Sequence, residues 1–138
     1  RHDVYYSVKS QKNDARVYTT DVCVPISKLV ECIKFVEIEV QKYGLKAPMV
    51  GHVGDGNFHT TFLYDPSKKE DYDLIRKFCN KLIEKALELD GTITGEHGVG
   101  IHKKEYLIKQ HGDNIPIMRS IKKTLDPNNI MNPGKIFD

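Results

Sequence analysis

Two histidines, His52 and His59, flank a glycine-rich turn between two short apolar runs. The glycine, aspartate and asparagine residues of this turn tolerate the positive φ angles of a hairpin. If Val53 pairs with Phe58, the histidines lie directly opposite each other on one sheet face, with β-carbons about 4.5–5.5 Å apart. The spacing therefore predicts that the two imidazoles bind one metal ion. Two polar residues on an exposed strand face are the alternative.

Glu96 and His97 form a second candidate cluster, between Gly95 and Gly98. Glycines leave room for a ligand to approach the backbone. In an extended segment adjacent side chains point to opposite sides, so one could face a metal and the other a substrate. A carboxylate added to two histidines gives three ligands with open coordination positions, which is typical of catalytic metal sites. Taken alone, the pair is weak evidence and is better explained by a solvated loop.

Other polar residues are better explained without chemistry. Asp55 stands between glycines, where an aspartate is ordinary in a turn. His2, His102 and His111 lie among charged residues, which indicates solvated surface positions. We assign no chemical role to these four residues.

The elements that position the candidate residues follow from the apolar periodicity of the chain. Strands are predicted at residues 16–24, 47–53 and 58–64, with a brief one within 91–101. Helices are predicted from Ser27 to Gly44, from a capping box of Ser67 and Glu70 to Gly91, and from Asn114 to Pro127 with Ile117, Ile121 and Leu125 buried. This order predicts an α+β fold, a ferredoxin-like half-domain with helices on one face of an antiparallel sheet, plus a C-terminal helix and tail.

Composition narrows the function classes. A length of 138 residues suits one globular domain, and a net charge of +2 gives no support to nucleic acid or an anionic membrane as partner. No apolar run approaches the roughly 18 residues of a membrane span. Three cysteines without CxxC spacing indicate reduced core thiols: Cys23, Cys32 and Cys79. No GxGxxG fingerprint follows a predicted strand, so the motifs predict no dinucleotide-binding site within these residues.

Three segments together resemble a known family. They are GHVGDGNFH at residues 51–59, TGEHGVG at 94–100 and LDPNNIMNPGK at 125–135. They look like the motifs of FAD-linked oxidases of the D-lactate dehydrogenase (cytochrome) and D-2-hydroxyglutarate dehydrogenase type. The resemblance implies that residues 1–138 are the C-terminal substrate or cap portion of such an enzyme, and that its FAD-binding domain is absent from this chain.

The same resemblance implies roles for individual residues. His52, His59 and Glu96 match the family's ligands of a divalent metal, zinc or manganese. His97 matches the catalytic base, and Arg1 matches an arginine that binds the substrate carboxylate. The metal ligands agree with the set suggested by the hairpin and the Glu-His pair.

The sequence also points to a substrate class through the resemblance. Tyr5, Thr19 and Thr61 fall where hydroxyglutarate enzymes would place a threonine, a lysine and an asparagine. Residues 20–27 look like the D-lactate dehydrogenase branch instead. We therefore expect a small monocarboxylate, D-lactate rather than D-2-hydroxyglutarate or glycolate.

The implied activity is oxidation of D-lactate to pyruvate with hydride transfer to FAD, aided by the metal and a histidine base. The family further implies a mitochondrial enzyme that passes electrons to cytochrome c, and this chain alone is expected to be inactive. Two rival classes remain open at this stage: a metal-dependent hydrolase and a non-catalytic binding domain of ferredoxin-like shape.

Overall fold

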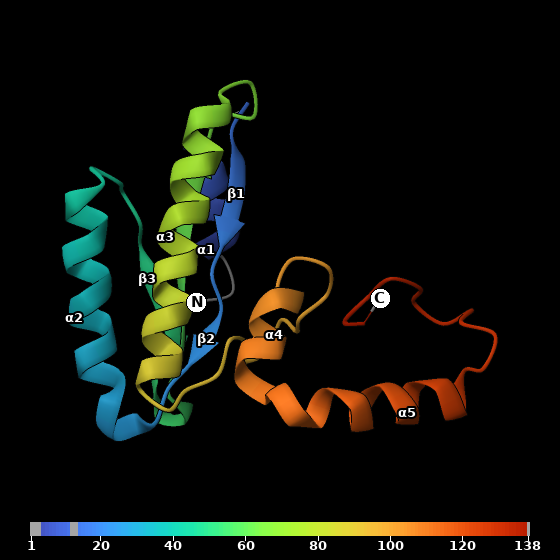
Figure 1. The fold of residues 1–138 in the computed structure, drawn as a ribbon. Coiled ribbons are helices and arrows are strands. Elements are labelled where there is room, and N and C mark those ends of the chain that lie inside the picture. Colours follow the sequence, from blue (N-terminus) through green and yellow to red (C-terminus); the bar gives the residue numbers. More distant parts are fainter. Residues whose placement is uncertain (1–3, 12–13, 138) are drawn as a thin grey trace. The chain divides into compact units, whose positions relative to one another are not determined.

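The computed structural model describes residues 4–11 and 14–137 of the chain. It divides into two compact units, Arg1–Gly95 (unit 1) and Glu96–Asp138 (unit 2). Unit 1 contains an antiparallel sheet with helices, and unit 2 contains helices and an irregular tail (Figure 1). No helix among the described residues has both the length and the apolar character needed to cross a bilayer.

The sheet of unit 1 is built around its longest strand, β4. All its neighbours run antiparallel to β4: β1 (Arg16–Thr19), β2 (Val22–Cys23) and β3 (Met49–His52), with β4 at Asn57–Tyr64. β1 and β2 share one continuous register along β4, so they are one strand interrupted at Thr20 and Asp21. The pairs on either side of this interruption are Thr19 with Thr61 and Val22 with Phe58.

Two long helices, α2 (Ile26–Lys42) and α3 (Lys69–Glu88), lie side by side in Figure 1. The rings of Phe62 on β4 and Phe78 on α3 meet edge to face with centroids 5.0 Å apart, and both side chains are buried. Because strand side chains alternate, the even-numbered residues of β4 face α3 and the odd-numbered ones, including His59, face the opposite side. A short helix, α1 (Val4–Lys9), packs against β1 and β4.

The α+β class predicted from the sequence is confirmed, and several details differ. The capping box is wrong: Lys68 is the N-cap residue of α3, and Ser67 donates its hydroxyl hydrogen to Asp65 at 2.6 Å instead. The strand expected within residues 91–101 is reduced to one bridge between Cys23 and Thr92. Glycines punctuate that segment and limit any longer pairing.

Unit 2 consists of α4 (Lys104–His111), a short 3-10 turn (Gly112–Asn114), α5 (Ile115–Leu125) and the tail. α5 begins just after Asn114, as predicted. Its expected buried face is wrong, because three residues of the stripe are largely exposed: Ile117 at 60%, Ile121 at 56% and Leu125 at 71%. Periodicity identifies residues that share a helix face, but it does not show what covers that face.

Candidate functional site

His59 is the most strongly positioned of the predicted site residues. It lies in β4 and is only 7% exposed. Its Nδ1 atom is 3.0 Å from the main-chain carbonyl oxygen of Thr20. A carbonyl oxygen can only accept, so Nδ1 carries the hydrogen of this bond, and in the neutral ring Nε2 carries the lone pair that a metal ion needs. A hydrogen bond from the ring nitrogen that does not bind the metal commonly orients a metal-binding histidine.

The interruption of the strand explains why the Thr20 carbonyl reaches His59. Thr20 lies opposite Thr60, and its amide donates to the Thr60 carbonyl at 2.9 Å. In a regular antiparallel ladder the Thr60 amide would donate back to the Thr20 carbonyl. Here it donates to the Thr20 hydroxyl at 2.8 Å. The side chain thus replaces the carbonyl in the ladder, and the carbonyl bonds the His59 ring.

Asp21 is a site residue that sequence reasoning missed. Its side chain is buried, with Oδ1 3.8 Å from His59 Nδ1. Oδ1 accepts a hydrogen bond from Asn57 Nδ2 at 2.8 Å, and Oδ2 accepts from Thr94 Oγ1 at 2.5 Å and from the Gly95 amide at 2.9 Å. The sequence does contain one signal for it, an aspartate inside a strand-like run of valine and threonine. Such a carboxylate is buried only where several hydrogen-bond donors hold it, which marks the position as unusual.

His52 lies at the end of β3, and the predicted direct opposition of the two histidines is wrong. His52 pairs with Asn57, whereas Val50 pairs with His59. The connection is a 3-10 turn over Val53–Asp55 followed by Gly56 at φ 74°, which shifts the register by two residues. A shift of two keeps both histidines on the same face, as diagonal neighbours about 7–8 Å apart, within reach of long side chains.

Glu96 and His97 are the first residues of unit 2. Their side chains are about half exposed, and Glu96 Oε1 lies 3.7 Å from His97 Nε2. The two side chains approach each other rather than pointing to opposite sides, because this segment is bent rather than extended. Gly95, the residue before Glu96, is held in place by the hydrogen bond from its amide to Asp21.

Gly95 is required by the close approach of side chains. A Cβ at this position would overlap the Asn57 side chain and lie 3.0 Å from Asp21 Oδ1. Asn57 itself is buried, and its Nδ2 donates to Asp21 and to the Val22 carbonyl, each at 2.8 Å. Among the described residues its Oδ1 atom has no hydrogen-bond partner. Such a buried acceptor beside His52 and His59 fits a site that holds a metal-bound water or a substrate hydroxyl.

The remaining sequence-based assignments have different outcomes. Arg1 and His2 lie outside the described residues. Asp55 lies in the 3-10 turn, and its carbonyl accepts from Cys23 Sγ at 3.1 Å, which supports the expected turn role. Burial, followed by the carboxylates of Asp21 and Asp55, raises the pKa of the Cys23 thiol. Cys23 is therefore held as a neutral thiol next to the site.

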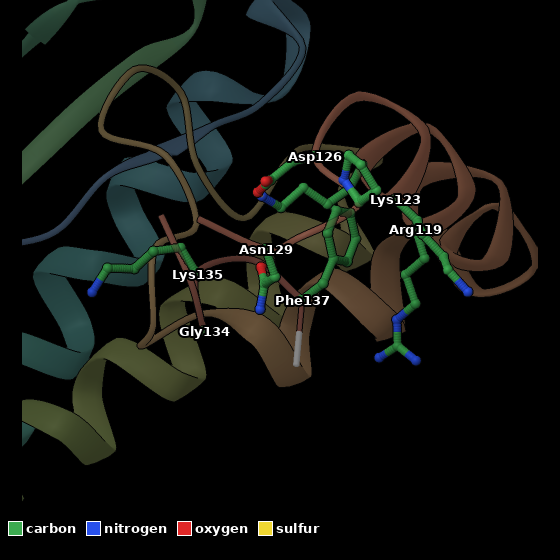
Figure 2. Close-up of a pocket in the computed structure, with 9 residues that line it drawn as sticks. Arg119, Lys123, Asp126, Asn129, Gly134, Lys135 and Phe137 are labelled. Carbon is green, nitrogen blue, oxygen red and sulfur yellow. The ribbon is translucent and has the colours of Figure 1, made fainter. Parts of the chain in front are cut away.

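Unit 2 contains a pocket of its own between the end of α5 and the tail (Figure 2). Its lining includes the cations Arg119, Lys122, Lys123 and Lys135. Lys122 forms an ion pair with Asp126, and Figure 2 shows Arg119 and Lys135 extending in different directions. These charges do not converge on one point, and none of the predicted catalytic or metal-binding residues lines the pocket.

Comparison with known proteins gives one family match and several related sequences. Residues 2–136 match the family described as FAD linked oxidases, C-terminal domain. The chain is 40% identical over its whole length to a probable mitochondrial D-lactate dehydrogenase of Danio rerio. It is 48% identical over 86% of its length to a mitochondrial D-lactate dehydrogenase (cytochrome) of Arabidopsis thaliana, and 41% identical over 85% to a glycolate oxidase subunit of Bacillus subtilis.

The chain is much shorter than these relatives. It spans 28% of the Danio rerio protein, 21% of the Arabidopsis thaliana protein and 25% of the Bacillus subtilis protein. The matched region contains all three motifs singled out in the sequence, at residues 51–59, 94–100 and 125–135.

Proposed function

Because the chain belongs to the family of FAD linked oxidases, C-terminal domain, we propose that it is the substrate and metal portion of a flavin-dependent D-2-hydroxyacid dehydrogenase that oxidises D-lactate to pyruvate. The structural observation that carries this proposal is the buried His59 ring, whose Nδ1 is bonded to the Thr20 carbonyl. With the hydrogen on Nδ1, the lone pair of a neutral His59 ring is on Nε2, the atom proposed to bind the metal. The FAD-binding domain would lie outside these residues.

Three residues are proposed to hold a divalent metal, zinc or manganese: His52, His59 and Glu96. Two imidazoles and a carboxylate suit either ion and leave coordination positions open. When bound, the metal supplies a Lewis acid that makes the substrate hydroxyl more acidic. The buried Oδ1 of Asn57 would accept a hydrogen bond from a water or hydroxyl in the same site.

His97 is proposed to act as the general base. Its neutral imidazole would take the proton of the substrate hydroxyl while the carbinol carbon loses its hydrogen as hydride and the carbonyl of pyruvate forms. FAD, when bound, supplies the acceptor of the two electrons. Glu96 beside His97 would then keep the protonated imidazole close to a negative charge.

The substrate proposal rests on the side chains beside His59. Thr61 is two residues further along β4, on the same face, and it pairs directly with Thr19 on β1. These are positions where hydroxyglutarate enzymes would carry an asparagine and a lysine. Two short hydroxyls offer no cation for a second carboxylate, which favours a small monocarboxylate such as D-lactate.

Glycolate is the second candidate substrate, because one relative is named a glycolate oxidase subunit. D-2-hydroxyglutarate is disfavoured by the two threonines. A metal-dependent hydrolase and a non-catalytic binding domain are disfavoured by the family match over residues 2–136. By analogy with relatives named mitochondrial and cytochrome-linked, we further propose a mitochondrial location and cytochrome c as acceptor.

The test is anaerobic reduction of the flavin in the purified natural protein, loaded with FAD and zinc or manganese. D-Lactate should bleach the flavin faster than glycolate or D-2-hydroxyglutarate. His97→Ala should slow bleaching by about 100-fold or more with normal metal content. His102→Ala, at an exposed position, is the control and should leave the rate unchanged.

Metal analysis of two further variants completes this test. His52→Ala and Glu96→Ala should each lose most of the bound metal, whereas His102→Ala should retain it. A His97→Ala variant that bleaches at the normal rate would refute the base. Full metal content in both ligand variants would refute the proposed ligand set.

A further inference from the structure

We infer that the strand interruption at Thr20 and Asp21 is a positioning device for the proposed metal site, with Thr20 fixing the His59 ring and Asp21 fixing the backbone before Glu96. The expected effects on metal binding rest on the proposed function. The device itself is visible in unit 1 alone, through hydrogen bonds that end at His59, Asn57, Thr94 and Gly95.

The Thr20 hydroxyl is the element that makes the device possible. By accepting from the Thr60 amide, it satisfies a buried donor that would otherwise take the Thr20 carbonyl. The carbonyl is then available to bond His59 Nδ1 at 3.0 Å. A residue without a side-chain acceptor at position 20 would leave the Thr60 amide unsatisfied, which costs about 1–3 kcal/mol, unless the carbonyl returned to the ladder.

The Asp21 carboxylate links three segments that are far apart in the sequence. Through one side chain it holds Asn57 at the start of β4 and both Thr94 and Gly95 at the end of unit 1. Its Oδ1 atom is also 3.8 Å from His59 Nδ1, where a negative charge favours the tautomer with hydrogen on Nδ1. Both ends of the proposed ligand set, His59 and the residue before Glu96, are therefore tied to adjacent residues of one strand.

This arrangement assigns Thr20 and Asp21 a role through other residues. Neither is proposed to touch the metal or the substrate. Groups that orient metal ligands typically change metal affinity by about 10–100-fold when they are removed. A merely structural role would lower stability without changing which His59 nitrogen carries the hydrogen.

The experiment compares Thr20→Val and Thr20→Ser in the purified natural protein. Valine has the same shape as threonine and favours strands, so the variant should fold, and serine restores the hydroxyl. Nitrogen NMR of the metal-free protein should show His59 with hydrogen on Nδ1 in the wild type and in Thr20→Ser. In Thr20→Val that signal should be lost or shared between the two ring nitrogens.

Calorimetry with zinc and with manganese gives the second readout. Thr20→Val and Asp21→Asn should weaken metal binding by about 10–100-fold, and Thr20→Ser should restore it. Thr60→Val is the matched control: its side chain is fully buried beside Thr20, and within the described residues its hydroxyl oxygen has no hydrogen-bond partner. It should change neither the tautomer nor the affinity.

The outcomes separate this inference from the proposed function. If Thr20→Val keeps the Nδ1 hydrogen and normal metal affinity, the positioning role is overturned. If the wild type binds no metal, the proposed metal site fails, and the tautomer comparison in the metal-free protein still decides whether Thr20 positions His59. If Asp21→Asn is too unstable to purify, the Thr20 pair carries the decision.

Discussion

At the scale of single residues, one buried carboxylate organises an irregular part of each unit. Asp21 does so in unit 1, and Asp126 does so where the tail of unit 2 begins. Asp126 accepts hydrogen bonds from the amides of Ile130 and Met131, each at 2.9 Å, and forms an ion pair with Lys122. In each case the carboxylate accepts hydrogen bonds from backbone amides that lie outside regular helices and strands.

The Asp126 network predicts an acid-dependent loss of stability. The hydrogen bond from Lys122, followed by those from the Ile130 and Met131 amides, lowers the pKa of Asp126. The folded chain therefore holds this proton less strongly than the unfolded chain. The stabilisation is fully present above the pKa of an unfolded aspartate, about 3.9, and is lost as the pH falls through the lower folded value.

The measurement compares wild type with Asp126→Asn by urea unfolding from pH 7 down to pH 3. The wild type should be more stable at pH 7, and the difference in unfolding free energy should shrink as the pH falls below about 4. Asp113→Asn, at an exposed position of the neighbouring turn, is the control and should give a small difference at every pH. A difference for Asp126→Asn that stays constant with pH would contradict the ion pair.

The sequence predicted the shared sheet face of His52 and His59 better than it predicted how the candidate residues are held. The spacing of His52 and His59 predicts that they share one sheet face and pair directly. The structure agrees with the shared face but not with the direct pairing. Register depends on the turn, and both a four-residue loop and a 3-10 turn are compatible with the glycines of the segment. The role of Thr20 was not predictable, because a hydroxyl replacing a carbonyl in a ladder leaves no pattern in the sequence.

At the scale of elements, the packing of β4 against α3 fixes the side of the sheet on which His59 lies. Phe62 and Phe78 meet on the even-numbered face of β4, so the odd-numbered residues must point the other way. Ion pairs between Lys81 and Glu39 and between Lys85 and Glu31 join α3 to α2. Each pair has at least one partner that is open to solvent, which limits its contribution to stability. We therefore expect the aromatic contact to dominate.

Truncation of Phe78 tests this expectation. Phe78→Ala should lower the free energy of unfolding by about 3–5 kcal/mol, because it removes a fully buried ring and leaves a cavity against Phe62. Ile38→Ala on α2 is the control: Ile38 is 63% exposed, and its loss should cost less than about 0.5 kcal/mol. Urea denaturation followed by circular dichroism measures both. Equal, small losses would show that this contact does not hold α3 on the sheet.

The long helices were predictable as elements and the short ones were not. α2 and α3 have a strong apolar stripe, and their predicted spans agree with the structure to within a few residues at each end. α4 was missed because only Tyr106 and Leu107 of its eight residues are buried, too few to produce a periodic pattern. The exposed stripe of α5 is the opposite case: its apolar period is clear and predicts burial, but the structure leaves those residues exposed.

At the scale of the whole molecule, the described chain has two compact units and spans between 21% and 28% of the three relatives compared. No dinucleotide fingerprint occurs in the sequence, and the family name refers to the C-terminal domain of FAD linked oxidases. Metal binding and flavin binding are therefore expected to be separable properties.

The last prediction follows from that separation. The 138-residue chain, purified without further sequence, should bind about one zinc or manganese ion but should neither retain FAD nor oxidise D-lactate. Calorimetry measures the metal, and the quenching of flavin fluorescence measures FAD. A yellow chain with stoichiometric flavin would show that these residues form a complete flavin site. A chain that binds no metal would show that the Thr20 and Asp21 contacts are not sufficient to hold the metal ligands. The flavin domain would then be needed to organise them.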